Sequence, residues 1–451
     1  MKAVMITSDR SGSGKTLMTM GLLRCLQNRG LDMGACKCGP DYIDPMFHES
    51  VLKIPSRNLD TFLMGEAKTV REISKFADKD AVIAEGAMGY YDGLGNTDRH
   101  SAYHIARITG MPAVAVISPG GAALTIAAQL RGMLDFREDS NIKGIIFNNC
   151  SEKRYENLKE MTERETGIRV LGYLPHIKEA EIESRHLGLK TPEEIKGLEE
   201  KVDIISNELE KRVDIDLFLQ MMKSISAVRI SSERNEKRCR LAVAKDEAFC
   251  FYYKSSLEAL EEAGAELVFF SPLHNSSLPL DIDGLYLGGG YPELYAEELS
   301  ENKTMLNNIR YEIENGLPTI AECGGFLYLG KSITDDMDRK FEMAGVLGGN
   351  AERKNGLVRF GYENLEIERN SMLFNAGESI PVHEFHHWDT DENGTDTEVK
   401  KAGNNISYRG GFVKNDLYAA FPHLSLEGVL PLAKRFVDKM CINKTEKSKC
   451  P

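Results

Sequence analysis

A glycine-rich loop near the N-terminus is the first segment whose residue types and spacing suit catalysis. The apolar residues 3–7 predict a strand, Gly12, Ser13 and Gly14 predict a loop, and Lys15 and Thr16 begin a helical pattern. Glycines let a loop turn its backbone N–H groups toward phosphate, and a helix N-terminus favours the same anion. Lys15 is expected to neutralise phosphate charge, and the Thr16 hydroxyl to ligate magnesium.

This loop departs from the standard phosphate-binding pattern at Asp9, where glycine is usual. A structural Gly-Ser turn is the alternative interpretation. The preceding strand and the following helix favour the phosphate site, because that motif requires this context.

Acidic residues lie at or after the ends of two predicted strands of the same half, and a magnesium–phosphate site recruits such oxygen ligands. The candidates are Asp41, Asp44, Glu85 and Asp92. Glu85 follows the apolar run 81–84, the position of a Walker-B acid. Each aspartate also suits a turn beside Gly or Pro, and for Asp92 alone the two interpretations weigh equally.

The second reactive segment is a cysteine between an apolar strand and a helix. Residues 317–321 predict the strand, Cys323 stands at the turn, and Gly324 and Gly325 leave the approach to it open. This is the pattern of a nucleophile elbow, in which the helix start favours the reactive thiolate. Ala321 stands where such elbows often have glycine. A buried structural cysteine at a strand end is the alternative.

Backbone donors and a base must accompany a nucleophilic thiol. The glycine run 288–290 ends another apolar strand, so the N–H groups of Gly289 and Gly324 are predicted to bind an oxyanion. The candidate bases are His383, His386, His387 and His423. A metal site at 383–387 is disfavoured, because adjacent histidines supply too few ligands and no cysteine pair flanks them.

Two series of short apolar runs alternating with helical patterns must position these residues. They predict two doubly wound α/β domains, each with a parallel sheet whose carboxyl ends bind ligands. The expected strands are 3–7, 34–37, 81–85, 113–117, 144–147 and 169–173, then 241–244, 266–270, 284–287 and 318–321. The expected division is a domain at 1–190, a charged helical linker at 191–237, a domain at 238–440 and a frayed polar tail at 441–451.

Bulk properties narrow the class of protein. A chain of 451 residues predicts more than one domain, and a net charge of −13 argues against nucleic-acid or anionic-membrane surfaces. Nine scattered cysteines indicate reduced thiols in a cytoplasm rather than a disulfide framework. The uncharged stretch 110–130 has a Ser-Pro-Gly-Gly break, so a strand, a loop and a packed helix are expected there instead of a membrane span.

The ordered motifs resemble those of the cobyrinate a,c-diamide synthase family over nearly the whole chain. They are the phosphate loop, GPDYIDP at 39–45, SRNLD at 56–60, EGAMGYYDG at 85–93, RHLGL at 185–189, GGGYPE at 288–293 and ECGGF at 322–326. The segments at 39–45 and 85–93 are specific to the family. The glutamine-using half is shared with many class-I amidotransferases.

The resemblance implies an ATP- and glutamine-dependent ligase of cobalamin biosynthesis that amidates the a and c acetate groups of cobyrinate. It implies a dethiobiotin synthetase-like N-terminal domain in which Thr16, Asp41 and Glu85 hold Mg²⁺. By the same analogy, the residues near the corrinoid or the intermediate are Tyr42, Ile43, Asp44 and Asp92. Cys323 would pair with His423, whose orienting partner stays open because Ser425 replaces the usual glutamate.

The expected mechanism has two parts. ATP phosphorylates a substrate carboxylate, because oxide is a poor leaving group, and Cys323 releases ammonia from glutamine for the displacement of phosphate. Nickel-sirohydrochlorin a,c-diamide synthase and cobyric acid synthase are alternatives with similar motifs. A phosphate-loop scaffold or partitioning ATPase is the alternative of another class, although such a protein would often lack the elbow cysteine. The sequence is compatible with a homodimer.

Overall fold

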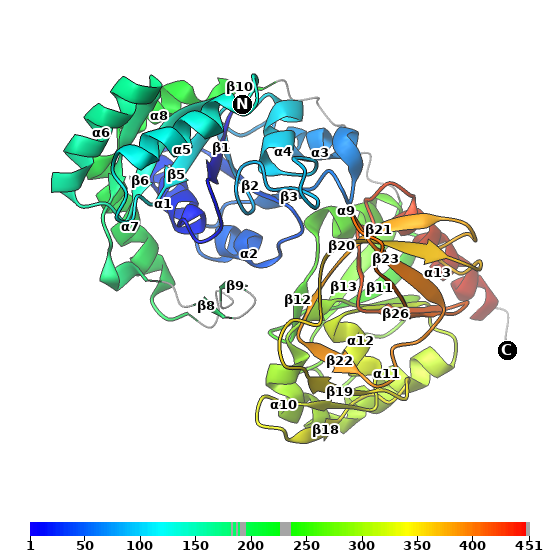
Figure 1. Cartoon of the computed structure of the whole chain (residues 1–451). Coiled ribbons are helices and arrows are strands. Elements are labelled where there is room, and N and C mark those ends of the chain that lie inside the picture. The colour runs from blue at the N-terminus through cyan, green and yellow to red at the C-terminus, as the bar shows by residue number, and fades with distance from the viewer. Residues whose placement is uncertain (182–183, 186–187, 190–194, 226–235, 448–451) are drawn as a thin grey trace. The chain divides into compact units, whose positions relative to one another are not determined.

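The computed structural model describes residues 1–181, 184–185, 188–189, 195–225 and 236–447. The chain divides into two compact units, which are described separately (Figure 1). The first unit comprises Met1–Thr61 and Gly65–Ile230, and the second comprises Phe62–Met64 and Ser231–Pro451.

The first unit is built on a mostly parallel sheet of order β3-β2-β4-β1-β5-β6-β7, with β10 paired antiparallel to β1 at one end. Its strands are β1 Lys2–Ser8, β2 Met33–Cys38, β3 Ser56–Leu59, β4 Ala81–Glu85, β5 Ala113–Ile117, β6 Ile142–Asn148, β7 Arg169–Leu174 and β10 Lys223–Ser224. The central strands β1, β2, β4 and β5 are short, largely apolar and almost wholly buried, as expected of a sheet with both faces covered, whereas the two residues of β10 are exposed.

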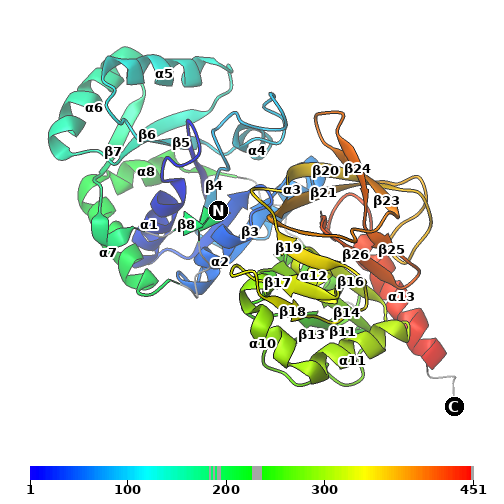
Figure 2. The ribbon, with the colours of Figure 1, turned by 60° about the horizontal axis from the view of Figure 1, so that its bottom comes forward.

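Helices cover both faces of this sheet (Figures 1 and 2). They are α1 Lys15–Asn28, α2 Ile43–Ser50, α3 Gly65–Ser74, α4 Ala102–Thr109, α5 Leu124–Asp135, α6 Glu152–Thr166, α7 Leu198–Arg212 and α8 Ile215–Met221, with a 3₁₀ turn at Lys178–Ala180 and a small hairpin of β8 Ser184–Arg185 and β9 Gly188–Leu189. Apolar residues of α3, α4, α5 and α6 form one core with the sheet. Helix α1 packs against α7, where a Cβ on Gly21 would come within 2.6 Å of the Ile205 side chain.

The charged stretch that was predicted as a linker belongs to the first unit. Leu198, Val202, Ile205 and Leu209 are buried on one side of α7, while the charged residues cover its other side. Strand β10 then returns to pair with β1. The boundaries at 190 and 237 are therefore wrong, because this amphipathic helix completes the layer over α1.

The second unit contains a six-stranded sheet of order β13-β11-β14-β16-β26-β25. Its strands are β11 Cys239–Ala244, β13 Ala265–Phe270, β14 Gly284–Leu287, β16 Thr319–Glu322, β25 Phe412–Val413 and β26 Leu417–Ala420, and only β25 is antiparallel to its neighbour. Helices α9 Lys254–Glu262 and α13 Leu432–Lys447 contribute to the core on one face. On the other face lie α10 Ala296–Glu301, α11 Lys303–Glu314, α12 Gly324–Leu329 and the 3₁₀ turn Pro292–Tyr295.

A mostly antiparallel region, which sequence reasoning missed, lies largely between β16 and β26 in the chain, and within it only β17 and β19 pair parallel. One sheet has the order β24-β23-β20-β21-β27, with β20 Arg359–Ile367, β21 Ser379–His386, β23 Thr397–Lys401, β24 Ser407–Gly410 and β27 His423–Leu424. A second has the order β18-β17-β19-β22, with β17 Ser332–Thr334, β18 Lys340–Glu342, β19 Asn350–Arg353 and β22 Trp388–Thr390. A further pair joins β12 Phe249–Phe251 to β15 Gly289–Gly290.

Most sequence expectations for the two parallel sheets are confirmed, and every expected strand is present. The stretch 110–130 is strand β5, a loop and helix α5 as predicted, and within the described ranges no helix is long and apolar enough to cross a membrane. The expectation of a frayed tail at 441–451 is corrected in part. Helix α13 continues to Lys447 and Cys441 packs against the core, while residues 448–451 lie outside the described residues.

The α7 interface gives a stability prediction. Ile205 is fully buried and neighbouring Ile204 is 37% exposed. Ile205→Ala should lower the free energy of unfolding by about 2 to 5 kcal/mol, since it leaves a cavity between α7 and α1. Ile204→Ala, the matched control, should change it by less than about 1 kcal/mol. Urea denaturation measures both, and equal small effects would show that α7 does not contribute to the core.

Candidate functional site

The loop before α1 has the backbone that the phosphate motif requires. Gly12 and Gly14 have φ angles of 76° and 88°, in the left-handed region open to glycine. A Cβ on Gly14 would lie 2.1 Å from Nδ2 of Asn148, which donates a hydrogen bond of 2.9 Å to the Ser13 carbonyl. Asn148, at the end of β6, therefore holds the loop in place.

Asp9, the departure from the standard loop pattern, bonds within the same loop. Its Oδ1 accepts a 3.0 Å hydrogen bond from Ser13, and its Oδ2 accepts one of 2.7 Å from Gln129. Asp9 therefore stabilises the loop through Ser13, which lies within it, and through Gln129 of α5.

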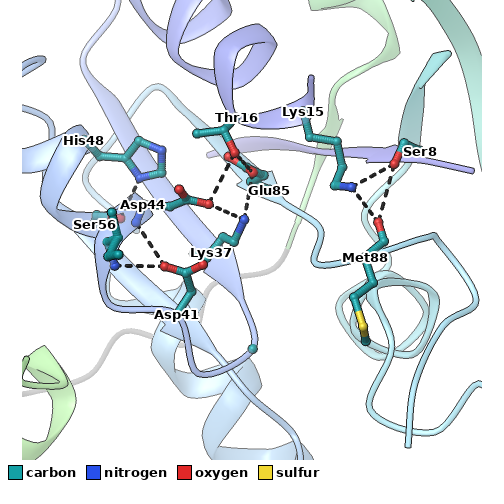
Figure 3. A network of polar contacts seen from close by, with 12 residues as sticks. Ser8, Lys15, Thr16, Lys37, Asp41, Asp44, His48, Ser56, Glu85 and Met88 are labelled. Carbon is teal, nitrogen blue, oxygen red and sulfur yellow. Dashed lines mark hydrogen bonds and ion pairs between the residues drawn. The ribbon is translucent and has the colours of Figure 1, made fainter. Parts of the chain in front are cut away.

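Lys15 projects from the first turn of α1 into a set of oxygen atoms. Its Nζ donates to Ser8 Oγ at 2.8 Å and to the Met88 carbonyl at 2.5 Å, as Figure 3 shows. Burial is the main cause that lowers the pKa of Lys15 to about 8. The Ser8 hydroxyl and the Met88 carbonyl therefore hold the ammonium group.

A second buried lysine, Lys37 on β2, joins the acidic residues of the site (Figure 3). Its Nζ lies 2.7 Å from Glu85 Oε1 and also contacts Asp44 Oδ2. Thr16 Oγ1 donates to the same Glu85 oxygen at 2.7 Å and lies 3.4 Å from Asp44. Thr16, Lys37, Asp44 and Glu85 therefore form one cluster, the Glu85 cluster, from α1, β2, α2 and β4.

Burial and opposite charge compete in this cluster. Burial would lower the pKa of Lys37, but Asp44 and Glu85 raise it well above its ordinary value. Burial is also the largest influence on Asp44, yet the Lys37 charge lowers the pKa of that carboxyl. Burial raises the pKa of Glu85 to about 7 against the effect of Lys37. The Lys37 ammonium therefore stays charged beside Asp44 and Glu85.

Asp41 and Asp92, the other acidic candidates, make contacts within turns of the chain. Asp41 Oδ1 accepts hydrogen bonds from the N–H groups of Ile43 and Asp44 at 2.8 and 3.0 Å, so it caps the start of α2. Asp44 instead reaches Thr16 and Glu85. Tyr42 and Ile43 form the same turn, and Asp92 Oδ2 accepts from the Gly89 N–H at 2.9 Å, which is a turn contact.

The second unit shows the elbow geometry expected at Cys323. Its φ angle is 47°, a left-handed conformation that is uncommon for a residue with a side chain and typical of nucleophile elbows. A Cβ on Gly325 would lie 2.2 Å from the Leu287 carbonyl, and one on Gly324 would lie 2.8 Å from Pro292. Glycine is therefore needed at both positions for the close turn.

Burial favours the protonated form of the Cys323 thiol. Burial raises its pKa well above the ordinary value, and the charges of Glu293 and Glu384 raise it further, while a hydrogen bond from Gly324 acts in the opposite direction. A base must take the proton before the sulfur can attack.

His423 lies on β27, where β21 pairs with it antiparallel and His383 is its register partner. It follows β26, whose Ala420 accepts a 2.9 Å hydrogen bond from the Cys323 N–H. A Cβ on Gly289 would lie 2.5 Å from His423 Cε1, and the Cβ position of Gly324 is 3.1 Å from the Gly290 nitrogen. The glycine run therefore adjoins both the elbow and the imidazole. Gly289 and Gly324 stay predicted oxyanion donors.

The other histidines are held in structural contacts. His386 stacks on Phe421 with ring centroids 3.8 Å apart, and its Nδ1 contacts the Trp388 carbonyl at 2.6 Å. Burial is the main cause that lowers the pKa of His383 to about 3, and His423 adds to it. His383 and His386 are both buried. His387 Nδ1 contacts the Gly356 carbonyl at 2.8 Å.

Three contributing residues were missed from the sequence. Lys37 had a usable signal, because it is the only charged residue in the apolar run 33–38. Glu322 also had a usable signal, because it is an acidic residue directly before Cys323 in the sequence. Asn148 had no such signal, since its contact is with a loop far away in the sequence.

The histidine geometry gives a prediction for glutamine hydrolysis without ATP. His423→Ala should lower its rate by roughly a hundredfold or more, the usual scale of a lost general base. His387→Ala should leave it near wild type, and His386→Ala should act mainly through stability. Ammonia release measures the rate; loss in His386→Ala with retention in His423→Ala would reverse the assignment.

Comparison with known proteins covers both units. Residues 4–189 match the CobQ/CobB/MinD/ParA nucleotide binding domain, and residues 240–429 match the CobB/CobQ-like glutamine amidotransferase domain. The matched segments include Lys15, Thr16, Lys37, Glu85, Cys323 and His423.

Near-full-length relatives share this arrangement. The chain is 38% identical to a cobyrinate a,c-diamide synthase from Clostridium tetani and 40% identical to one from Clostridium acetobutylicum, in each case over 97% of this chain and 100% of the relative. A third, from Caldanaerobacter subterraneus, is 38% identical over 97% of this chain and 98% of its own length. The chain belongs to the cobyrinate a,c-diamide synthase family.

Proposed function

We infer that this protein is a ligase that uses ATP and glutamine to convert the a and c acetate carboxylates of cobyrinate to amides. The observation that supports this inference is one chain with a phosphate loop beside the Glu85 cluster in its first unit and, in its second, a cysteine elbow and a histidine that both adjoin the glycine run 288–290. One site suits the activation of a carboxylate and the other suits the release of ammonia.

In the first unit, the phosphate loop binds ATP and the substrate carboxylate attacks its terminal phosphoryl group. Lys15 leaves its carbonyl partners for the phosphates and balances their charge. Lys37 is placed to stabilise the same transferring group, because it is a fixed cation beside Thr16. The products of this step are an acyl phosphate and ADP.

Magnesium fits the Glu85 cluster. No hydrogen-bond donor reaches the buried Oε2 of Glu85 within the described residues, and Thr16, Asp44 and Glu85 supply the oxygen ligands that a hard cation prefers. In the described ranges no three His, Cys, Asp or Glu side chains gather as metal ligands, so phosphate and water would complete the coordination. Bound Mg²⁺ would offset the negative charge of the phosphates.

In the second unit, His423 takes the proton of Cys323 and the sulfur attacks the amide carbon of glutamine. The oxyanion meets the N–H groups at Gly289 and Gly324, and protonated His423 gives its proton to the departing ammonia. Water then hydrolyses the glutamyl thioester to glutamate. Ammonia displaces phosphate from the acyl phosphate and forms the amide.

The proposed setting is the cytoplasm, with ATP, glutamine and cobyrinate as partners. The charge of −13 supports the absence of a nucleic-acid partner. Assembly as a homodimer stays part of the proposal.

The defining experiment supplies cobyrinate, sirohydrochlorin or nickel-sirohydrochlorin with ATP and glutamine and follows amide formation by mass spectrometry. We expect two amides on cobyrinate. Diamidation of a sirohydrochlorin alone would overturn the substrate, and ATP hydrolysis without amidation of any ring would overturn the ligase.

A first variant tests the division of labour. Cys323→Ser should abolish amidation with glutamine and retain it with high ammonium, because the serine hydroxyl is a much weaker nucleophile than the thiol in this site. Product formation with each nitrogen donor is the measurement. Equal loss with both donors in a folded variant would contradict separate sites.

A second set of variants tests the first unit. Lys15→Ala and Glu85→Gln should lower amidation by roughly a hundredfold or more with either nitrogen donor, while part of the glutaminase activity persists. Asp44→Asn should be more damaging than Asp41→Asn, since Asp44 contacts Lys37. Asp78→Asn, at a 74% exposed side chain, is the control and should match wild type. Near-normal ATP consumption in the first two variants would show that the ATP site lies elsewhere.

A further inference from the structure

Glu322, the residue before the nucleophile, is a completely enclosed carboxylate with an exposure of 1%. Its Oε1 accepts a 3.0 Å hydrogen bond from the Leu424 N–H, and its Oε2 accepts one of 3.0 Å from the Tyr286 hydroxyl. The same Oε2 lies 3.6 Å from Nδ1 of His423. Such contacts in catalytic sites are commonly long before substrate binds.

The turn after β16 directs two adjacent side chains to different sides of the sheet. Glu322 is the last residue of β16, and Cys323 follows it at the positive-φ turn into α12, so the two side chains leave the chain in different directions. Tyr286, the partner of Glu322, belongs to the core on the side of α13, whereas Cys323 belongs to the core on the side of α12.

The two fixed hydrogen bonds determine which oxygen faces the imidazole. A backbone N–H can only donate, so Leu424 holds Oε1 and leaves Oε2 toward His423. A carboxylate oxygen can only accept, so the facing Nδ1 must carry the ring proton. The other nitrogen, Nε2, then keeps its lone pair and can act as a base.

We propose that Glu322 is the positioning residue of the glutaminase site and holds His423 in the tautomer that can deprotonate Cys323. This inference rests on the proposed glutamine hydrolysis. The glutamate comes from the strand of the nucleophile instead of the position two residues after the histidine, where Ser425 stands.

Two other candidate groups, Ser425 and Glu384, make different contacts. Within the described residues, buried Ser425 Oγ has no hydrogen-bond partner, so it does not bond to the histidine. Glu384 bonds to Tyr408 and lies 3.4 Å from His386 Nε2. Its contacts are therefore with a different histidine.

Glu322→Gln tests the tautomer directly. The side-chain carbonyl must still accept from Leu424, so the amide NH₂ takes the place of Oε2 and turns a donor toward Nδ1. The proton should then move to Nε2. Nitrogen-15 NMR of histidine-labelled protein distinguishes the two tautomers, and His423→Ala identifies the resonance. The NMR reading needs no turnover, so it separates this inference from the proposed function.

The rate of glutamine hydrolysis provides a second test of the proposal. Glu322→Gln should lower ATP-independent glutaminase kcat by about a hundredfold or more, the scale expected when a base is held in the wrong tautomer. Glu322→Asp should restore much of this loss, and ammonia-dependent amidation should persist in both. The matched control is Glu363→Gln, since Glu363 is also 1% exposed and accepts a tyrosine hydroxyl, that of Tyr408 at 3.3 Å. It should leave the tautomer unchanged.

An unchanged His423 tautomer in Glu322→Gln, or a kcat within about twofold of wild type, would overturn the proposal. If Glu322→Gln does not fold, Tyr286→Phe takes its place. That change removes one of the two hydrogen bonds to the carboxylate, so kcat should fall severalfold; an unaltered kcat would again overturn it. A wild-type protein that hydrolyses no glutamine would reject the proposed function instead.

Discussion

Glu85 ends β4 with its carboxylate fully buried, and a charge in that position is costly unless an opposite charge or several donors accompany it. Lys37 and Thr16 meet this requirement, and they come from β2 and α1. The need to compensate one buried acid therefore brings together strand ends and a helix start that lie far apart in the sequence. The same residues then present a cation and oxygen ligands beside the phosphate loop.

Glu322 repeats this arrangement in the second unit, again as the last residue of a parallel strand. Its compensation comes from hydrogen bonds rather than a lysine, and they fix the orientation of each oxygen. Removing one partner of such a buried group costs more than the contact itself, because the other partner stays unsatisfied. Both sites are consequently well defined before any substrate arrives.

The parallel sheets and the reactive segments could be predicted from the sequence, because buried strands are apolar runs and their motifs are local. Cys323 and Lys15 are examples, each inside a strand-loop-helix pattern. The resemblance implied Asp41 as the metal ligand, whereas in the structure it is Asp44 that contacts Thr16 and Lys37. Both aspartates follow the same strand, and only the start of α2 decides which one turns inward. The antiparallel strands were missed because their polar alternation resembles that of a solvated surface, although Glu384 and His386 are buried. Glu322 was missed for another reason. Its partners Tyr286 and Leu424 are distant in the chain, so only the folded structure shows its role.

The burial of Cys323 has a consequence for the durability of the protein. Peroxides oxidise thiolates far faster than thiols, and the first product is a sulfenic acid that proceeds to irreversible forms. A sulfur kept protonated by its surroundings is therefore shielded from this damage between turnovers. In the proposed mechanism His423 removes this proton for each reaction, so the same proton would also protect the sulfur from oxidants between turnovers.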